Sequence, residues 1–146
     1  MGKELFNSIA EVYGWFHGYQ ARRFAAILDR HAPRIGMAGM RTICDVGCGT
    51  GALCSVLAMR GHEVTGVDPA QRMLAVAKRK APSDSITFVR GDALEGLPFS
   101  DHAFDLVITS HVAHGMRSDK RKLFYRELMR IADKAVVIHD YNEERA

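Results

Sequence analysis

The sequence predicts an α/β domain with a doubly wound, mostly parallel sheet and helices on both faces. Two observations support this fold class: short apolar strand-like runs alternate with helical segments from about residue 41 onward, and no repeat, low-complexity stretch or linker divides the chain. The chain has 146 residues, which is enough for one hydrophobic core and short for two. We therefore expect a single domain over residues 1–146, with residues 1–40 as an N-terminal helical cap and loop and residues 41–146 as the core.

Two amphipathic helical stretches are expected before the sheet. Apolar residues with helical spacing mark the first stretch, at Leu5, Ile9, Val12, Tyr13 and Phe16, and the second, at Phe24, Ile27 and Leu28. The segment "HAPRIGMAGMR", residues 31–41, contains one proline and two glycines and predicts a loop.

The predicted core contains about five strands and three helices. The strands are expected near residues 41–46, 62–68, 85–91, 104–110 and 134–140, and the helices near 51–61, 70–81 and 118–132. Gly61 is expected to end the first of these helices, and Ser118 or Asp119 to cap the last. Residues 92–103 are too rich in turn-forming residues for a long helix.

Composition and charge exclude several classes of protein. The formal net charge of +3 is too small for a nucleic-acid-binding signature, and no apolar run reaches membrane-spanning length. Cys44, Cys48 and Cys54 are odd in number and lack metal-binding spacing. We expect them to be reduced thiols in a cytoplasmic protein, with no zinc site and no disulfide framework.

The stretch "ICDVGCGTGALC", residues 43–54, predicts a strand, a tight glycine turn and the start of a helix, an arrangement that presents backbone to a ligand. Its glycines match one accepted form of the dinucleotide fingerprint, G-x-G-x-x-A, over residues 47–52. Asp68 follows Gly47 by 21 residues, where a ribose-binding acid is expected. At this point an NAD(P)-dependent oxidoreductase is one open interpretation.

Three further features favour another ligand. Asp45, two residues before the first glycine, would repel a pyrophosphate but can help hold an ammonium group. Asp92, at the end of the third predicted strand, offers a carboxylate to which an adenine amino group can donate. Helical sequence also precedes the first strand, whereas dinucleotide-binding units commonly begin with the strand.

The motifs "DVGCGTG", "VTGVDP" with the following "ML", "GDALEGLPFSDHAFD" and "LVITSHVAHG" occur in order over residues 45–115, after the helical "IAEVYGWF". In these motifs the chain resembles the class I S-adenosylmethionine-dependent methyltransferases, in particular the small-molecule branch that includes quinone-biosynthesis C-methyltransferases. The resemblance implies a Rossmann-like fold, S-adenosylmethionine as cofactor, and methyl transfer to a small-molecule acceptor.

The resemblance also implies a role for each cofactor-binding residue. The glycines of the turn would let the backbone approach the methionine part of the cofactor, Asp68 would accept the ribose hydroxyls, and Asp92 would meet the adenine amino group. The Ala93 N–H would meet a ring nitrogen, and the Ser110 backbone would face the ammonium. The full expected set is Tyr13, Asp45, Gly47, Cys48, Gly49, Gly51, Asp68, Pro69, Met73, Asp92, Ala93, Leu94 and Ser110. Asp68 has a second possible role as N-cap of the following helix, with Pro69 in its first turn.

Candidate catalytic residues lie where the strands are expected to end, because ligands of open parallel sheets bind beyond the carboxyl ends of the strands. His111 and His114 follow the fourth strand and are candidates for a general base; His139, Asp140 and Tyr141 follow the fifth. No metal site is expected, since two histidines without a third ligand bind metal poorly. The remaining histidines, His17, His31, His62 and His102, are expected at the surface. The basic residues between 117 and 130 are expected on the solvated face of a helix.

Members of the resembled family normally carry two more strands after the fifth. The sequence therefore leads us to expect a fragment whose last strand, near residues 135–141, is an uncovered apolar edge, and a homodimer formed through it. A cofactor-binding domain without activity of its own remains an alternative to an active methyltransferase.

Overall fold

The computed structural model describes residues 3–140, with side chains from residue 15 onward. Its sheet has five strands in the order β3-β2-β1-β4-β5, and every neighbouring pair is parallel. The strands are β1 (Thr42–Val46), β2 (Glu63–Asp68), β3 (Thr87–Arg90), β4 (Phe104–Ser110) and β5 (Ala132–His139). The helices are α1 (Lys3–Ile35), α2 (Ala52–Met59), α3 (Gln71–Lys80) and α4 (Ser118–Ile131), with short 3-10 turns η1 (Met37–Gly39) and η2 (Ala113–Gly115).

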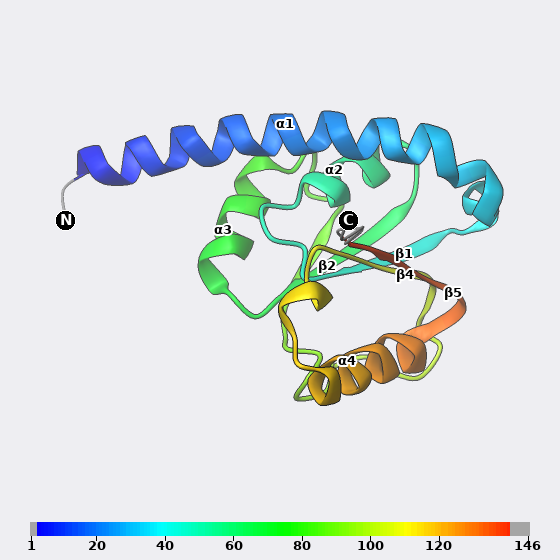
Figure 1. Cartoon of the computed structure of the whole chain (residues 1–146). Helices are drawn as coiled ribbons and strands as arrows, with labels where there is room; N and C mark the ends of the chain where they lie inside the picture. Colours follow the sequence, from blue (N-terminus) through cyan, green and yellow to red (C-terminus); the bar gives the residue numbers. More distant parts are fainter. Residues whose placement is uncertain (1–2, 141–146) are drawn as a thin grey trace, which may run out of the picture.

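The helices cover both faces of the sheet. In Figure 1, α1 lies across α2 on one side of the sheet and α4 lies on the opposite side. This is the doubly wound α/β architecture that the alternation of strands and helices predicts, and that prediction is confirmed. From β1 the chain adds β2 and β3 on one side of the sheet and then β4 and β5 on the other side. The carboxyl ends of β1 and β4 therefore border the crevice where open α/β sheets bind ligands.

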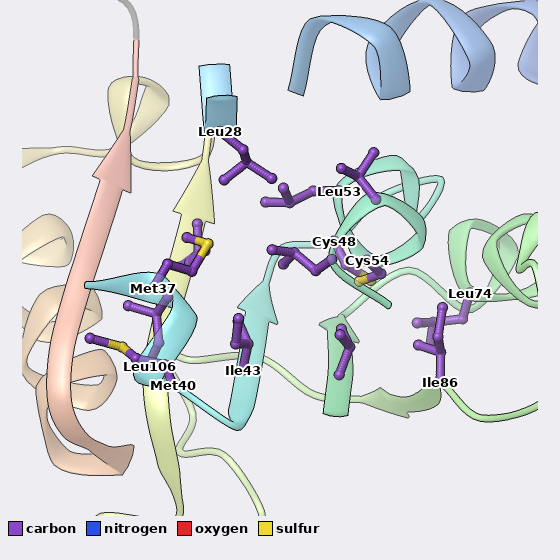
Figure 2. Close-up of a cluster of buried hydrophobic side chains, with 14 residues drawn as sticks. Leu28, Met37, Met40, Ile43, Cys48, Leu53, Cys54, Leu74, Ile86 and Leu106 are labelled. Carbon is purple, nitrogen blue, oxygen red and sulfur yellow. The ribbon is translucent and has the colours of Figure 1, made fainter. Parts of the chain in front are cut away.

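Two hydrophobic layers hold the sheet between the helices. Along β1 the side chains alternate: Ile43 joins the layer under α1 and α2, and Cys44 joins the layer over α4. Figure 2 shows the first layer, in which Leu28 of α1 lies next to Leu53 of α2. Burial on both faces explains why the strand-like runs are apolar without a clean alternation of polar residues.

The N-terminal region differs from the expected pair of helices and loop, because α1 is one helix that continues through Pro33 to Ile35. Proline removes only its own N–H from the last turn, while Ile35 in that turn packs against the core and holds the chain in helical form. The helix ends at Gly36, whose φ of 66° is the left-handed conformation that favours glycine after a helix.

Helix α4 and its basic residues also differ in detail from the expectation. Arg117 occupies the N-cap, and neither Ser118 nor Asp119 caps the helix through its side chain. Arg130 is not simply a solvated charge, because its guanidinium donates to Glu127 Oε1 at 2.5 Å and to Asp101 Oδ1 at 2.9 Å. The bond to Asp101 fixes the turn-rich segment before β4, which contains no long helix, as predicted.

Candidate functional site

A pocket of about 150 Å³ opens at the carboxyl ends of β1 and β4, between the glycine turn and α1. It lies at the point where the strand order reverses, as the rule for open α/β sheets requires. Its lining comes from α1, β1, the turn, α2, α3 and the end of β4: Phe16, Gln20, Phe24, Asp45, Gly47, Cys48, Gly49, Thr50, Ala52, Leu53, Met73, Ser110 and His111.

The three glycines of the turn have different surroundings, although all three have positive φ. A Cβ on Gly47 would lie 2.4 Å from Val112 Cγ2, and one on Gly51 would lie 2.9 Å from Ala77 Cβ. A Cβ on Gly49 would meet no heavy atom within 4 Å. Gly47 and Gly51 are therefore required by packing, whereas Gly49 leaves open space beside the backbone for a ligand.

Most N–H groups of the turn already have partners within the protein. Those of Gly47 and Cys48 both donate to the Val67 carbonyl, at 2.7 and 2.9 Å, and that of Gly49 donates to Asp68 Oδ2 at 3.0 Å. A pyrophosphate needs such N–H groups free, because its charge is bound by backbone donors. The turn is thus poorly suited to a dinucleotide and better suited to a ligand that packs against the backbone.

Asp68 ties the glycine turn to the end of β2. Its Oδ2 accepts the Gly49 N–H and its Oδ1 accepts the Ala70 N–H at 2.8 Å. The expected N-cap role is wrong, because Ala70 is the N-cap of α3 and Pro69 lies outside the helix. Each carboxylate oxygen keeps a second lone pair, so Asp68 retains the capacity to accept a hydrogen bond from a ligand hydroxyl.

Asp45 is the most unusual polar residue of the pocket, with a relative exposure of only 2%. Its Oδ2 accepts from the Cys54 thiol at 3.5 Å, while its buried Oδ1 has no hydrogen-bond partner among the described residues. Burial raises the pKa of Asp45 to about 7, the nearby Asp68 carboxylate raises it further, and the Cys54 thiol opposes this. A cation placed at Oδ1 would satisfy this group.

Helix α1 closes one side of the pocket through contacts that the sequence did not reveal. His17 Nδ1 lies 3.1 Å from the Thr50 carbonyl, and the Thr50 hydroxyl donates to Gln20 Oε1 at 3.4 Å. Phe24 continues the same helix face into the pocket. His17 is half-buried rather than a surface residue as expected, and so is His62, which contacts a backbone carbonyl elsewhere. The i, i+4 spacing of residues 16, 20 and 24 was the sequence signal that these three residues share one helix face.

The comparisons with known proteins agree with this geometry. Residues 44–138 match a family model described as a methyltransferase domain. The chain belongs to this family, the class I S-adenosylmethionine-dependent methyltransferases. The resemblance seen in the sequence motifs is confirmed.

Two curated relatives of this methyltransferase domain have names that refer to quinones. The ubiquinone biosynthesis O-methyltransferase of Methylocella silvestris is 40% identical over 85 residues, covering 58% of this chain and 32% of that protein. The demethylmenaquinone methyltransferase of Staphylococcus aureus is 42% identical over 85 residues, covering 55% and 33%. The match thus spans about a third of the length of these relatives.

A solved structure supports the fold of the methyltransferase domain. Magnesium protoporphyrin IX methyltransferase from Synechocystis, with bound SAH, superposes with a TM-score of 0.68 at 23% identity, covering 82% of this chain and 54% of that one. At that identity the likeness establishes the shared fold and nothing finer.

The structure brings part of the expected cofactor set together in the pocket. The expected residues that line it are Asp45, Gly47, Cys48, Gly49, Met73 and Ser110. Those that lie outside its lining are Gly51, Asp68, Pro69, Asp92, Ala93 and Leu94. Asp92 Oδ1 accepts the Leu94 N–H at 2.9 Å. Asp92 follows β3 and Asp68 ends the parallel strand β2, so both lie at the carboxyl ends of the strands. Tyr13 lies within α1, but its side chain is outside the described part of the structure, and Tyr141, expected after the fifth strand, lies outside the described residues.

The histidines near the ends of β4 and β5 have distinct environments. His111, with a positive φ of 58°, lines the pocket. His114 lies outside the pocket, where its exposed ring pairs with Asp140 at 3.0 Å. His139 packs its ring against that of His111, with centroids 4.7 Å apart. Burial lowers the pKa of both His111 and His139, which favours the neutral form of each imidazole.

Two absences complete the description. Among residues 3–140, whose side chains are described from residue 15 onward, no group of three or more described side chains could hold a metal ion. No helix in that same range is long and apolar enough to cross a membrane.

Proposed function

We propose that the chain binds S-adenosylmethionine in the pocket and transfers its methyl group to a small-molecule acceptor. One observation carries the proposal: Asp45, whose buried Oδ1 has no hydrogen-bond partner among the described residues, lines the same pocket as Gly49, where a Cβ would meet no heavy atom within 4 Å. A ligand with an ammonium group on a short aliphatic chain, such as the methionine part of this cofactor, suits both features. The solved relative with bound SAH and the names of the curated relatives support the same ligand.

Each residue of the site has a defined task in this proposal. Asp45 neutralises the ammonium, and the Gly49 backbone packs against the methionine chain. Asp68 accepts from the ribose hydroxyls with its remaining lone pairs, and Asp92 accepts from the adenine amino group. The bound cofactor supplies an activated methyl group, so the protein mainly aligns the acceptor and excludes water.

Calorimetric titration of the chain with S-adenosylhomocysteine tests the proposal, with NADH as the control ligand. We expect micromolar binding of the first and none of the second, because the N–H groups of Gly47, Cys48 and Gly49 are already engaged. Binding of NADH alone by a folded sample would contradict the proposal. Transfer of labelled methyl groups to a panel of quinols and phenols then measures activity.

We further propose that the chain works as a cytoplasmic homodimer joined through β5. Strand β5 is at one edge of the described sheet, and its Ile138 is 43% exposed. An apolar edge strand offers unpaired backbone groups to a second strand. The three cysteines are free and buried, as suits a reducing compartment. Sedimentation of a monodisperse monomer at micromolar concentrations would contradict the dimer.

A further inference from the structure

A second hollow, of about 60 Å³, adjoins the cofactor pocket under the C-terminal half of α1. The two spaces share Phe24, Leu53 and Ser110 in their linings, so a molecule in one would contact a ligand in the other. Side chains such as Ile108 of β4 and Val137 of β5 form the floor, and the exposed surface of the hollow is apolar. This shape and chemistry suit a hydrocarbon group.

Two residues that line the second hollow, Ser110 and His139, carry buried polar side-chain atoms. Ser110 Oγ and His139 Nδ1 are both buried, and neither has a hydrogen-bond partner among residues 15–140. Both residues line the second hollow, and Ser110 also lines the cofactor pocket. Buried polar groups in folded proteins are almost always bonded, so this pair indicates a site for a polar group of a ligand.

The surroundings of His139 suit a proton acceptor. The His111 N–H donates to the His139 carbonyl at 2.8 Å, and the Phe24 ring meets the His139 ring edge-on at 6.2 Å. The first contact fixes the backbone at the end of β5, and the second packs the imidazole against Phe24 of α1. Burial lowers its pKa; His111, Arg23 and His31 lower it further, and Asp140 opposes them. A neutral imidazole has one nitrogen free to accept a proton.

We infer that the methyl acceptor is an apolar hydroxyl compound of the phenol class, and that His139 is the base that receives its proton. The inference rests on the proposed function and specifies its acceptor. The hydrocarbon part of the acceptor occupies the second hollow, and its hydroxyl lies between Ser110 Oγ and His139 Nδ1. As the O–H bond breaks, the proton passes to the His139 ring. The oxygen electron pair forms the bond to the methyl carbon, and the electrons of the breaking C–S bond stay on sulfur.

This assignment replaces the bases expected from sequence. His114 is exposed and paired with Asp140, away from both spaces. His111 lines the cofactor pocket but not the second hollow, so its ring belongs to the cofactor side. His139 alone among these three lines the space that suits the acceptor.

The test uses the full chain and a pair of probes that differ by one hydroxyl group, 4-propylphenol and propylbenzene. NMR titration of isotope-labelled protein measures both affinities and the ring-nitrogen shifts of His139. We expect the phenol to bind at least tenfold more tightly and to shift the His139 nitrogens. The variant His139→Phe should lose this preference. The matched variant His114→Phe should keep it, because the exposed His114 lines neither of the two spaces.

Equal affinities for the two probes, or a phenol preference that survives in His139→Phe, would overturn the inference. If His139→Phe does not fold, His139→Gln and Ser110→Ala answer the same question. Titration with S-adenosylhomocysteine on the same samples separates the two proposals. Normal cofactor binding without phenol preference overturns the acceptor assignment alone, whereas phenol preference without cofactor binding overturns the proposed function.

Discussion

Cofactor binding should be linked to the ionisation of Asp45. Burial raises the pKa of this carboxyl to about 7, so the free protein holds a proton there over much of the physiological range. The ammonium of S-adenosylhomocysteine favours the ionised form, and binding must therefore release that proton. If only the ionised form binds, the affinity falls as the pH drops below 7 and is roughly eightfold weaker at pH 6.0 than at pH 7.5. The ammonium itself stays largely charged over this range, since the ordinary pKa of an α-amino group is about 8.

Calorimetry in two buffers of different ionisation enthalpy measures the released protons directly. At pH 6.0 we expect about 0.9 protons per ligand, and at pH 7.0 about 0.5. The isosteric variant Asp45→Asn should bind more weakly and with no slope between pH 5.5 and 7.5. 5′-Methylthioadenosine, which lacks the amino-acid group, is the matched ligand and should not release the Asp45 proton. A flat affinity profile in the wild-type protein, or an unchanged slope in Asp45→Asn, would refute the reasoning.

Four further substitutions separate ligand binding from folding. Asp68→Ala should weaken S-adenosylhomocysteine binding by about 1–3 kcal/mol and also loosen the turn, which titration together with amide exchange at Gly49 would detect. Gly49→Ala should cost about 1–3 kcal/mol of stability for a side chain at φ 54° while reducing affinity more than tenfold, since the methyl group enters open pocket space; unaltered binding would remove Gly49 from the site. Gly47→Ala should instead appear mainly as lost stability in urea, because its methyl group meets Val112 at 2.4 Å. Leu57→Ala, in the fully buried layer under α1, should cost about 2–5 kcal/mol and leave the affinity of the folded fraction unchanged.

Local chemistry explains which parts of the fold were predictable. The fourth strand was predicted at the residues where it forms, because a continuous apolar run bounded by turn residues leaves few alternatives. The glycine turn was recognisable because its conformation demands glycine. The end of α1 was missed because tertiary packing of Ile35 outweighs the local signal of Pro33. The contact of His17 with Thr50 joins residues 33 positions apart and has no local signature.

In the candidate site, too, the positions of residues could be predicted from the sequence, whereas their burial and contacts could not. Asp45 and Asp68 were identified from their spacing around the glycines, but spacing alone carries no information on burial, and burial is what shifts the pKa of Asp45. His139 and His111 could be placed at the ends of their strands from sequence. Their contact depends on β4 and β5 being neighbours, which places Ser110 opposite His139 in the strand register.

The unpartnered atoms of Asp45, Ser110 and His139 share one physical origin. The strands end inside the protein rather than in water, because α1 covers one face of the sheet and lines both the pocket and the second hollow. Groups that would be hydrated at an ordinary strand end are therefore desolvated without a partner among residues 15–140, at a cost to stability. A ligand that supplies an ammonium at one position and a hydroxyl at the other recovers that cost, and a compound lacking either group does not. Under the proposed function, burial by α1 makes these three polar residues determinants of specificity, and the N-terminal helix is then part of the site rather than an appendage to the core.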